Sequence, residues 1–125
     1  MIVAAITFVV LSIAIGVLQL ALALGAPLGE YTMGGEFSGK LPIKMRIAAL
    51  VQLFILFVFV IIVLTKAGLA FQQFYSFGRI GIWFIVAFFI LGSIMNLSSP
   101  SKKEKLIMGP ANIIALLSTL VVAVF

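Results

Sequence analysis

Hydrophobic positions cluster in four long stretches of the chain, separated by shorter segments that hold nearly all of the charged side chains. The stretches cover residues 2–25, 46–65, 80–97 and 108–125. Within them the only charged side chain is Arg46, at the start of the second stretch. Because a helix needs about 20 consecutive apolar residues to cross the hydrocarbon core of a bilayer, this pattern predicts four transmembrane helices.

The last uncharged run is short when it is counted from Pro110 to Phe125. It would span only about 24 Å at about 1.5 Å per residue, so we expect the helix to begin near residue 108. Proline is tolerated in the first turn of a helix, where its missing N–H costs little, and Pro110 fits that place. The pattern as a whole predicts an all-α membrane protein, an antiparallel four-helix transmembrane bundle that forms one domain over residues 1–125.

The distribution of cations indicates the orientation of such a bundle. Connections 26–45 and 98–107 face one side of the membrane, and the connection between the second and third helices faces the other. Cytoplasmic connections carry an excess of lysine and arginine. The first side has six cations, whereas the second has only Lys66 and Arg79; the six are Lys40, Lys44, Arg46, Lys102, Lys103 and Lys105. We therefore expect connections 26–45 and 98–107 in the cytoplasm and both termini outside.

The composition supports a membrane protein and excludes functions that need cysteine or histidine. Hydrophobic residues make up 65% of the 125 residues and charged residues only 9%, compared with about 25% charged residues in soluble domains. The chain contains neither cysteine nor histidine, which excludes thiol chemistry and imidazole metal ligands. We expect no metal and no cofactor. The net charge of +5 comes from cations beside the apolar stretches, so we expect no nucleic-acid partner.

Polar side chains inside the apolar stretches collect toward the side that has six cations. Gln19 and Gln52 each lie about six residues from that surface, which is about 9 Å at a rise of about 1.5 Å per residue. At that depth they can hydrogen-bond to each other across an antiparallel hairpin. Amides in such positions are also typical of simple helix–helix packing. The candidate ligand-binding residues of this half and its mouth are Gln19, Glu30, Arg46, Gln52, Asn96 and Asn112.

The two connections on that side carry recognisable short motifs. The first contains Gly25-Ala26-Pro27, Gly29, Gly34-Gly35 and Leu41-Pro42, followed by Arg46, and the region of the second contains Asn96, Ser99, Glu104 and Pro110. In these motifs the chain resembles a family of small bacterial membrane proteins of about this length, with four predicted spans and no assigned activity. The resemblance implies a bacterial plasma-membrane location and brings no catalytic or binding residues with it. It also implies that the two connections form one feature, with Arg46 paired to Glu30 or to Glu104.

Few side chains in this sequence could take part in catalysis. The carboxylates are Glu30, Glu36 and Glu104, and we expect all three to be exposed at the membrane surface. Neither a pair of acids nor a nucleophile with a base can be assigned. We therefore expect a non-enzymatic protein, either an accessory partner of another membrane protein or a binder of a lipid-like, hydrophobic ligand.

Two other functions stay open at this point. A small transporter or channel, formed with a second copy of the chain, needs polar helix faces that line a path through the membrane. A lipid-modifying enzyme needs at least two of Glu30, Arg46 and Glu104 within hydrogen-bond distance, beside a cavity that accepts a headgroup. The expected partners are membrane lipid, another membrane protein or a second copy of this chain.

Overall fold

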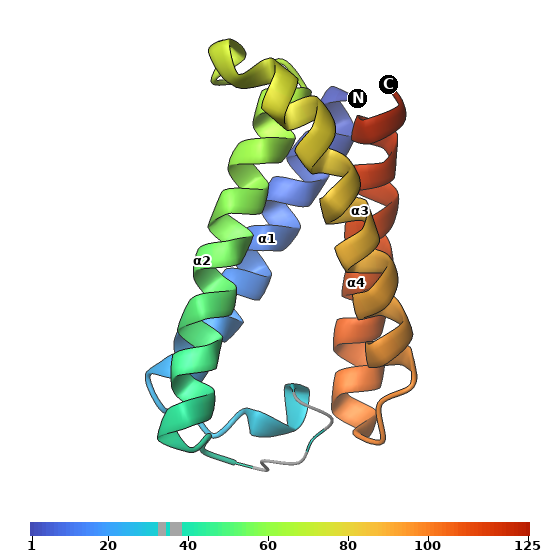
Figure 1. The fold of residues 1–125 in the computed structure, drawn as a ribbon. Helices are drawn as coiled ribbons and strands as arrows, with labels where there is room; N and C mark the ends of the chain where they lie inside the picture. The colour runs from blue at the N-terminus through green and yellow to red at the C-terminus, as the bar shows by residue number, and fades with distance from the viewer. Residues whose placement is uncertain (33–34, 36–38) are drawn as a thin grey trace.

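The computed structural model describes residues 1–32, 35 and 39–125 (Figure 1). Over these residues the chain forms four long helices, each long and apolar enough to cross a membrane. They are α1 (Ile2–Ala23), α2 (Ile43–Lys66), α3 (Tyr75–Leu97) and α4 (Lys102–Val124), with short 3-10 helices η1 (Gly29–Tyr31) and η3 (Gln72–Phe74). The predicted all-α four-helix bundle is confirmed.

The helices alternate in direction, so the bundle has two distinct ends (Figure 1). Both termini and the α2–α3 connection lie at one end, which we call the terminal end. The α1–α2 and α3–α4 connections lie at the other, which we call the connection end. All six cations grouped by the sequence pattern belong to the connection end or to the helix turns next to it.

The main hydrophobic core lies in the half of the bundle nearer the terminal end. All four helices contribute to it, and side chains such as Phe8, Val63, Ile82 and Val122 are fully buried there. The ring of Phe8 on α1 meets the ring of Phe89 on α3 edge to face, with 5.7 Å between their centroids. The close packing of these buried side chains fixes the positions of the four helices relative to one another.

The half nearer the connection end is built differently. Its buried apolar cluster comes from α1, α2 and the first connection, and it includes Leu22, Leu41 and Ala49. In Figure 1 the α1–α2 pair and the α3–α4 pair diverge toward this end. Within the second pair, α3 and α4 approach closely because Gly92 has no side chain: a Cβ there would lie 3.2 Å from Asn112 Oδ1. The connection half therefore consists of two hairpins rather than one four-helix core.

The start of α4 differs from the prediction. The helix begins at Lys102, and Pro110 lies well inside it, so the expectation that Pro110 occupies the first turn was wrong. The reason is an N-cap: Ser101 Oγ accepts a hydrogen bond from the backbone N–H of Glu104 at 3.3 Å. A capped N-terminus satisfies one of the free N–H groups of the first turn, which favours an earlier start of the helix.

Candidate functional site at the connection end

The end of α1 is held by Arg46 from α2. Arg46 Nε donates a hydrogen bond to the carbonyl oxygen of Ala23 at 2.9 Å, at a helix terminus where carbonyl groups lack helical partners. Gly25, just beyond, has a φ of +96°, and a Cβ at this position would lie 2.8 Å from Lys40 Cε. The positive φ calls for glycine there, because other residues are strained at such an angle, whereas the flexible end of the Lys40 side chain could move aside. The chain thus turns sharply after α1, next to the cationic side chains of Lys40 and Arg46.

The first connection then closes on itself and presents η1. The Gly29 N–H donates to the carbonyl oxygen of Gly39 at 2.8 Å, which joins the two sides of the loop. Glu30 follows in η1 with a half-buried side chain. This closure places Glu30 beside the start of α4, more than 70 residues further along the chain.

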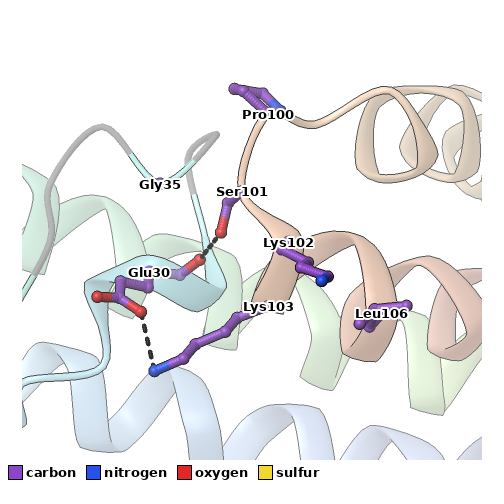
Figure 2. A pocket seen from close by; sticks show the side chains of 7 residues that line it. All are labelled: Glu30, Gly35, Pro100, Ser101, Lys102, Lys103 and Leu106. Atoms are coloured by element: carbon purple, nitrogen blue, oxygen red, sulfur yellow. Dashed lines mark hydrogen bonds and ion pairs between the residues drawn. The ribbon is translucent and has the colours of Figure 1, made fainter.

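The two connections meet at Glu30 (Figure 2). Its carboxylate lies 2.9 Å from Lys103 Nζ, and its backbone carbonyl accepts a hydrogen bond from Ser101 Oγ. Lys103 Nζ also lies 5.7 Å from the centroid of the Tyr31 ring, within the range of a cation–π contact. The side chains of Lys103 and Glu30 are 58% and 43% exposed, so water and salt screen the ion pair and it adds little to stability.

Glu104 is buried beside this contact, with only 6% of its surface exposed. Ser99 Oγ donates a hydrogen bond to its carboxylate at 3.1 Å, and the Ser101 N–H donates to Ser99 Oγ at 3.1 Å. The expectation that Glu104 is exposed was wrong, because the Ser99–Ser101 turn folds over its side chain. Glu36, the third carboxylate, lies outside the described residues.

An open hollow of about 610 Å³ lies at this junction (Figure 2). Its polar lining includes Glu30 and the side chains of Lys102 and Lys103, whereas Leu106 adds an exposed apolar surface one turn further into α4. The remaining lining residues are Gly35, Pro100 and Ser101. The arrangement offers ammonium groups beside an apolar side chain, which matches a molecule with an anionic part and a hydrophobic part.

The structure separates the six residues selected from the sequence. Glu30 lines the hollow, and the other five do not. Gln19 is buried, whereas Gln52 is exposed on the outside of α2 and does not share an interior site with it. The side-chain amides of Asn96 and Asn112 donate to carbonyl groups four residues earlier in their own helices, each at 2.9 Å. Ligand binding by these residues stays a prediction.

The predicted ion pair between Arg46 and Glu30 is not formed. The ion pair of Glu30 is made with Lys103 and not with Arg46, which bonds the end of α1. Sequence reasoning therefore missed Ser101 and Lys103 as site residues. The pattern Ser101-x-x-Glu104 is a capping-box signal that would have located the start of α4. No local signal marks the contact between Glu30 and Lys103.

No family model, curated protein or solved structure matches this chain. What is known of its class therefore comes from its own residues and fold. Four apolar helices that each suffice to cross a membrane are compatible with a multi-pass integral membrane protein. Its functional residues must likewise be inferred from the geometry at the connection end.

Proposed function

We propose that this chain is a non-enzymatic, multi-pass membrane protein whose connection end binds the headgroup of an anionic phospholipid. The hollow at the junction of the two connections carries this proposal. It places Lys102 and Lys103 next to the exposed apolar side chain of Leu106. A bound phospholipid would put its phosphate against the ammonium group of Lys102, since Lys103 is paired with Glu30, and an acyl chain along Leu106.

The charge of this end supports the same ligand. Four lysines are exposed there and have no ion-pair partner among the described residues: Lys40, Lys44, Lys102 and Lys105. Each lysine near an anionic membrane surface contributes about 1 kcal/mol of attraction. We further propose that this end faces the cytoplasm of a bacterial cell, with both termini outside, because six cations lie at it and only Lys66 and Arg79 serve the opposite end.

Native mass spectrometry from mild detergent tests the proposal. The purified protein is mixed with equal amounts of phosphatidylglycerol and phosphatidylcholine, and we expect it to retain phosphatidylglycerol preferentially. Lys102→Ala should lower that retention by about fivefold, which corresponds to about 1 kcal/mol. Arg79→Ala is the matched control, since it removes one exposed cation near the start of α3 at the terminal end. Equal retention of the two lipids by the unaltered protein would refute headgroup binding.

The two alternative functions receive less support from the geometry. A transport path would have to cross the terminal half, where Phe8, Val63 and Ile82 are fully buried in a packed core. A lipid-modifying enzyme would need acidic and basic groups assembled around one substrate. Instead, Glu30 pairs with Lys103, Arg46 bonds the end of α1, and Ser99 bonds the carboxylate of Glu104.

A further inference from the structure

The segment from Phe71 to Phe77, which leads from α2 into α3, is exposed at every residue although it is rich in aromatic side chains. We call it the aromatic segment; it comprises η3 and the start of α3, and its aromatic residues are Phe71, Phe74, Tyr75 and Phe77. Residues 67–78 contain no charged side chain. Because exposed apolar surface of this kind is unfavourable in water, the rings indicate a partner that is itself partly apolar.

The aromatic segment lies at the membrane-facing terminus of two spanning helices and not over the core. α2 ends at Lys66, and the chain then turns through positive φ values at Gly68 and Phe71, of +79° and +50°. In Figure 1, η3 and the start of α3 project sideways from the terminal end, past α2. η3 contributes no buried residue. The segment therefore extends away from the bundle at the level where α2 and α3 reach a membrane surface.

The polar and aromatic side chains around this segment lie on different faces. Gln72, Ser76 and Arg79 are exposed and follow at intervals of four and three residues, so they share one face. Phe74 and Phe77 are three residues apart, and their ring centroids are separated by 6.5 Å, so they form a separate aromatic face. A helical segment with one apolar and one polar face is typical of a segment that lies in the plane of a membrane interface.

The aromatic face also continues the outer surface of α3. Phe77, Phe84 and Leu91 follow at intervals of seven residues, which places them on one side of the helix. They are 75%, 73% and 58% exposed. In a membrane-spanning α3, Phe84 and Leu91 meet hydrocarbon, and Phe77 lies about 10 Å from Phe84 toward the membrane surface, at a rise of about 1.5 Å per residue. The lipid that covers Phe84 therefore extends to the aromatic face.

We propose that the aromatic segment lies in the interfacial layer of the lipid leaflet at the terminal end. The rings of Phe74 and Phe77 then lie at the boundary between headgroups and acyl chains, whereas Gln72, Ser76 and Arg79 face headgroups and water. This contact fixes the depth of α2 and α3 in the leaflet, because a movement of the bundle along the membrane normal would remove the rings from the interface. The inference is independent of headgroup binding, since it concerns an uncharged segment at the opposite end of the bundle.

Tryptophan fluorescence tests this placement, because the chain has a single tryptophan, Trp83. Trp83→Phe removes the native fluorophore, and Phe74→Trp, Phe77→Trp or Gln72→Trp is then added to that background. Each variant is reconstituted in phosphatidylcholine vesicles whose lipids carry a nitroxide quencher, either near the glycerol end of an acyl chain or near its methyl end. Iodide, present on both sides of the membrane in a separate series, quenches from water. Circular dichroism checks that each variant keeps the helix content of the unaltered protein.

We expect Phe74→Trp and Phe77→Trp to be quenched at least about twofold more by the shallow nitroxide than by the deep one, because interfacial segments lie only about 5–10 Å into the boundary layer. Trp83 of the unaltered protein is the reference for hydrocarbon, since it lies on α3 about 9 Å further from the terminal end than Phe77 and is half-exposed. It should respond more to the deep nitroxide than either variant. Gln72→Trp is the matched control on the polar face, and iodide should quench it at least about twofold more than the two phenylalanine variants.

Three results would overturn the proposal. Iodide quenching of Phe74→Trp and Phe77→Trp that equals the quenching of Gln72→Trp would mean that the rings meet water. Quenching mainly by the deep nitroxide, as for Trp83, would place the segment in hydrocarbon. Resistance to all three quenchers would mean that protein, such as a second copy of the chain, covers the rings. These vesicles contain no phosphatidylglycerol, so a failure of headgroup binding would leave the quenching unchanged.

Discussion

Lys66 Nζ donates a hydrogen bond to the carbonyl oxygen of Val122 at 3.1 Å, which joins the last residue of α2 to the last turn of α4. The carbonyl is one of the four at the end of α4 that have no helical partner, and a cation there also interacts favourably with the helix dipole. Lys66 is only 5% exposed, and its ammonium group lies 5.8 Å from the centroid of the Tyr75 ring. One cation thus connects three helices at the terminal end.

We expect Lys66→Met to destabilise the protein by about 1.5–3 kcal/mol, the usual contribution of a hydrogen bond to a charged group. The change keeps most of the side-chain volume but leaves the Val122 carbonyl without its partner. Unfolding in a titration with sodium dodecyl sulfate, followed by circular dichroism, measures the loss. Arg79→Met is the control, since Arg79 is exposed at the same end, and it should have little effect. Equal stability of the two variants would show that the Lys66 contact is not stabilising.

Gly92 sets the distance between α3 and α4. We expect Gly92→Leu to destabilise the bundle by about 1–3 kcal/mol, because even its Cβ would lie 3.2 Å from Asn112 Oδ1 and the rest of the side chain would force the helices apart. The same detergent titration detects this effect. Ala87→Leu adds a similar volume to an exposed position of α3 and should be tolerated. A comparable loss in both variants would contradict a specific role of Gly92 in packing.

Ser101 should matter more than the Glu30–Lys103 ion pair, although both join the connections. Ser101→Ala removes the N-cap of α4 and the bond to the Glu30 carbonyl, so we expect a loss of about 1–2 kcal/mol. Glu30→Gln removes only a solvent-screened ion pair and should cost less stability than Ser101→Ala. Hydrogen exchange at the first turn of α4 should accelerate in the serine variant alone. The reverse order of the two losses would contradict this interpretation.

Pro110 interrupts the hydrogen bonding of α4, since it has no N–H to donate to the carbonyl of Leu106. Its side chain is exposed and faces away from the interior. We therefore expect Pro110→Ala to stabilise the protein by about 1–3 kcal/mol, up to the difference in helix propensity between the two residues. A thermal or detergent unfolding curve measures the gain. Unchanged or lower stability would mean that the proline is required for the path of α4.

Composition and hydrophobic runs were sufficient to predict the four helices and their alternation. The reason is local: the length of an apolar run and the cost of a charge in hydrocarbon depend on neighbouring residues in the chain. The number of spans and the grouping of cations at one end follow from that alone. The start of α4 was also encoded locally, in Ser101 and Glu104, but the prediction gave more weight to Pro110.

Only the tertiary structure decided which side chains meet. Depth in the membrane can be counted along a helix, and Gln19 and Gln52 were placed at similar depth in this way. Rotation about the helix axis cannot be counted, because apolar residues cover all sides of these helices and no polar stripe marks an outer face. Packing therefore turned Gln19 inward and Gln52 outward. In the same way, Glu30 and Lys103 share no sequence pattern, and their contact exists because the first connection folds across the start of α4.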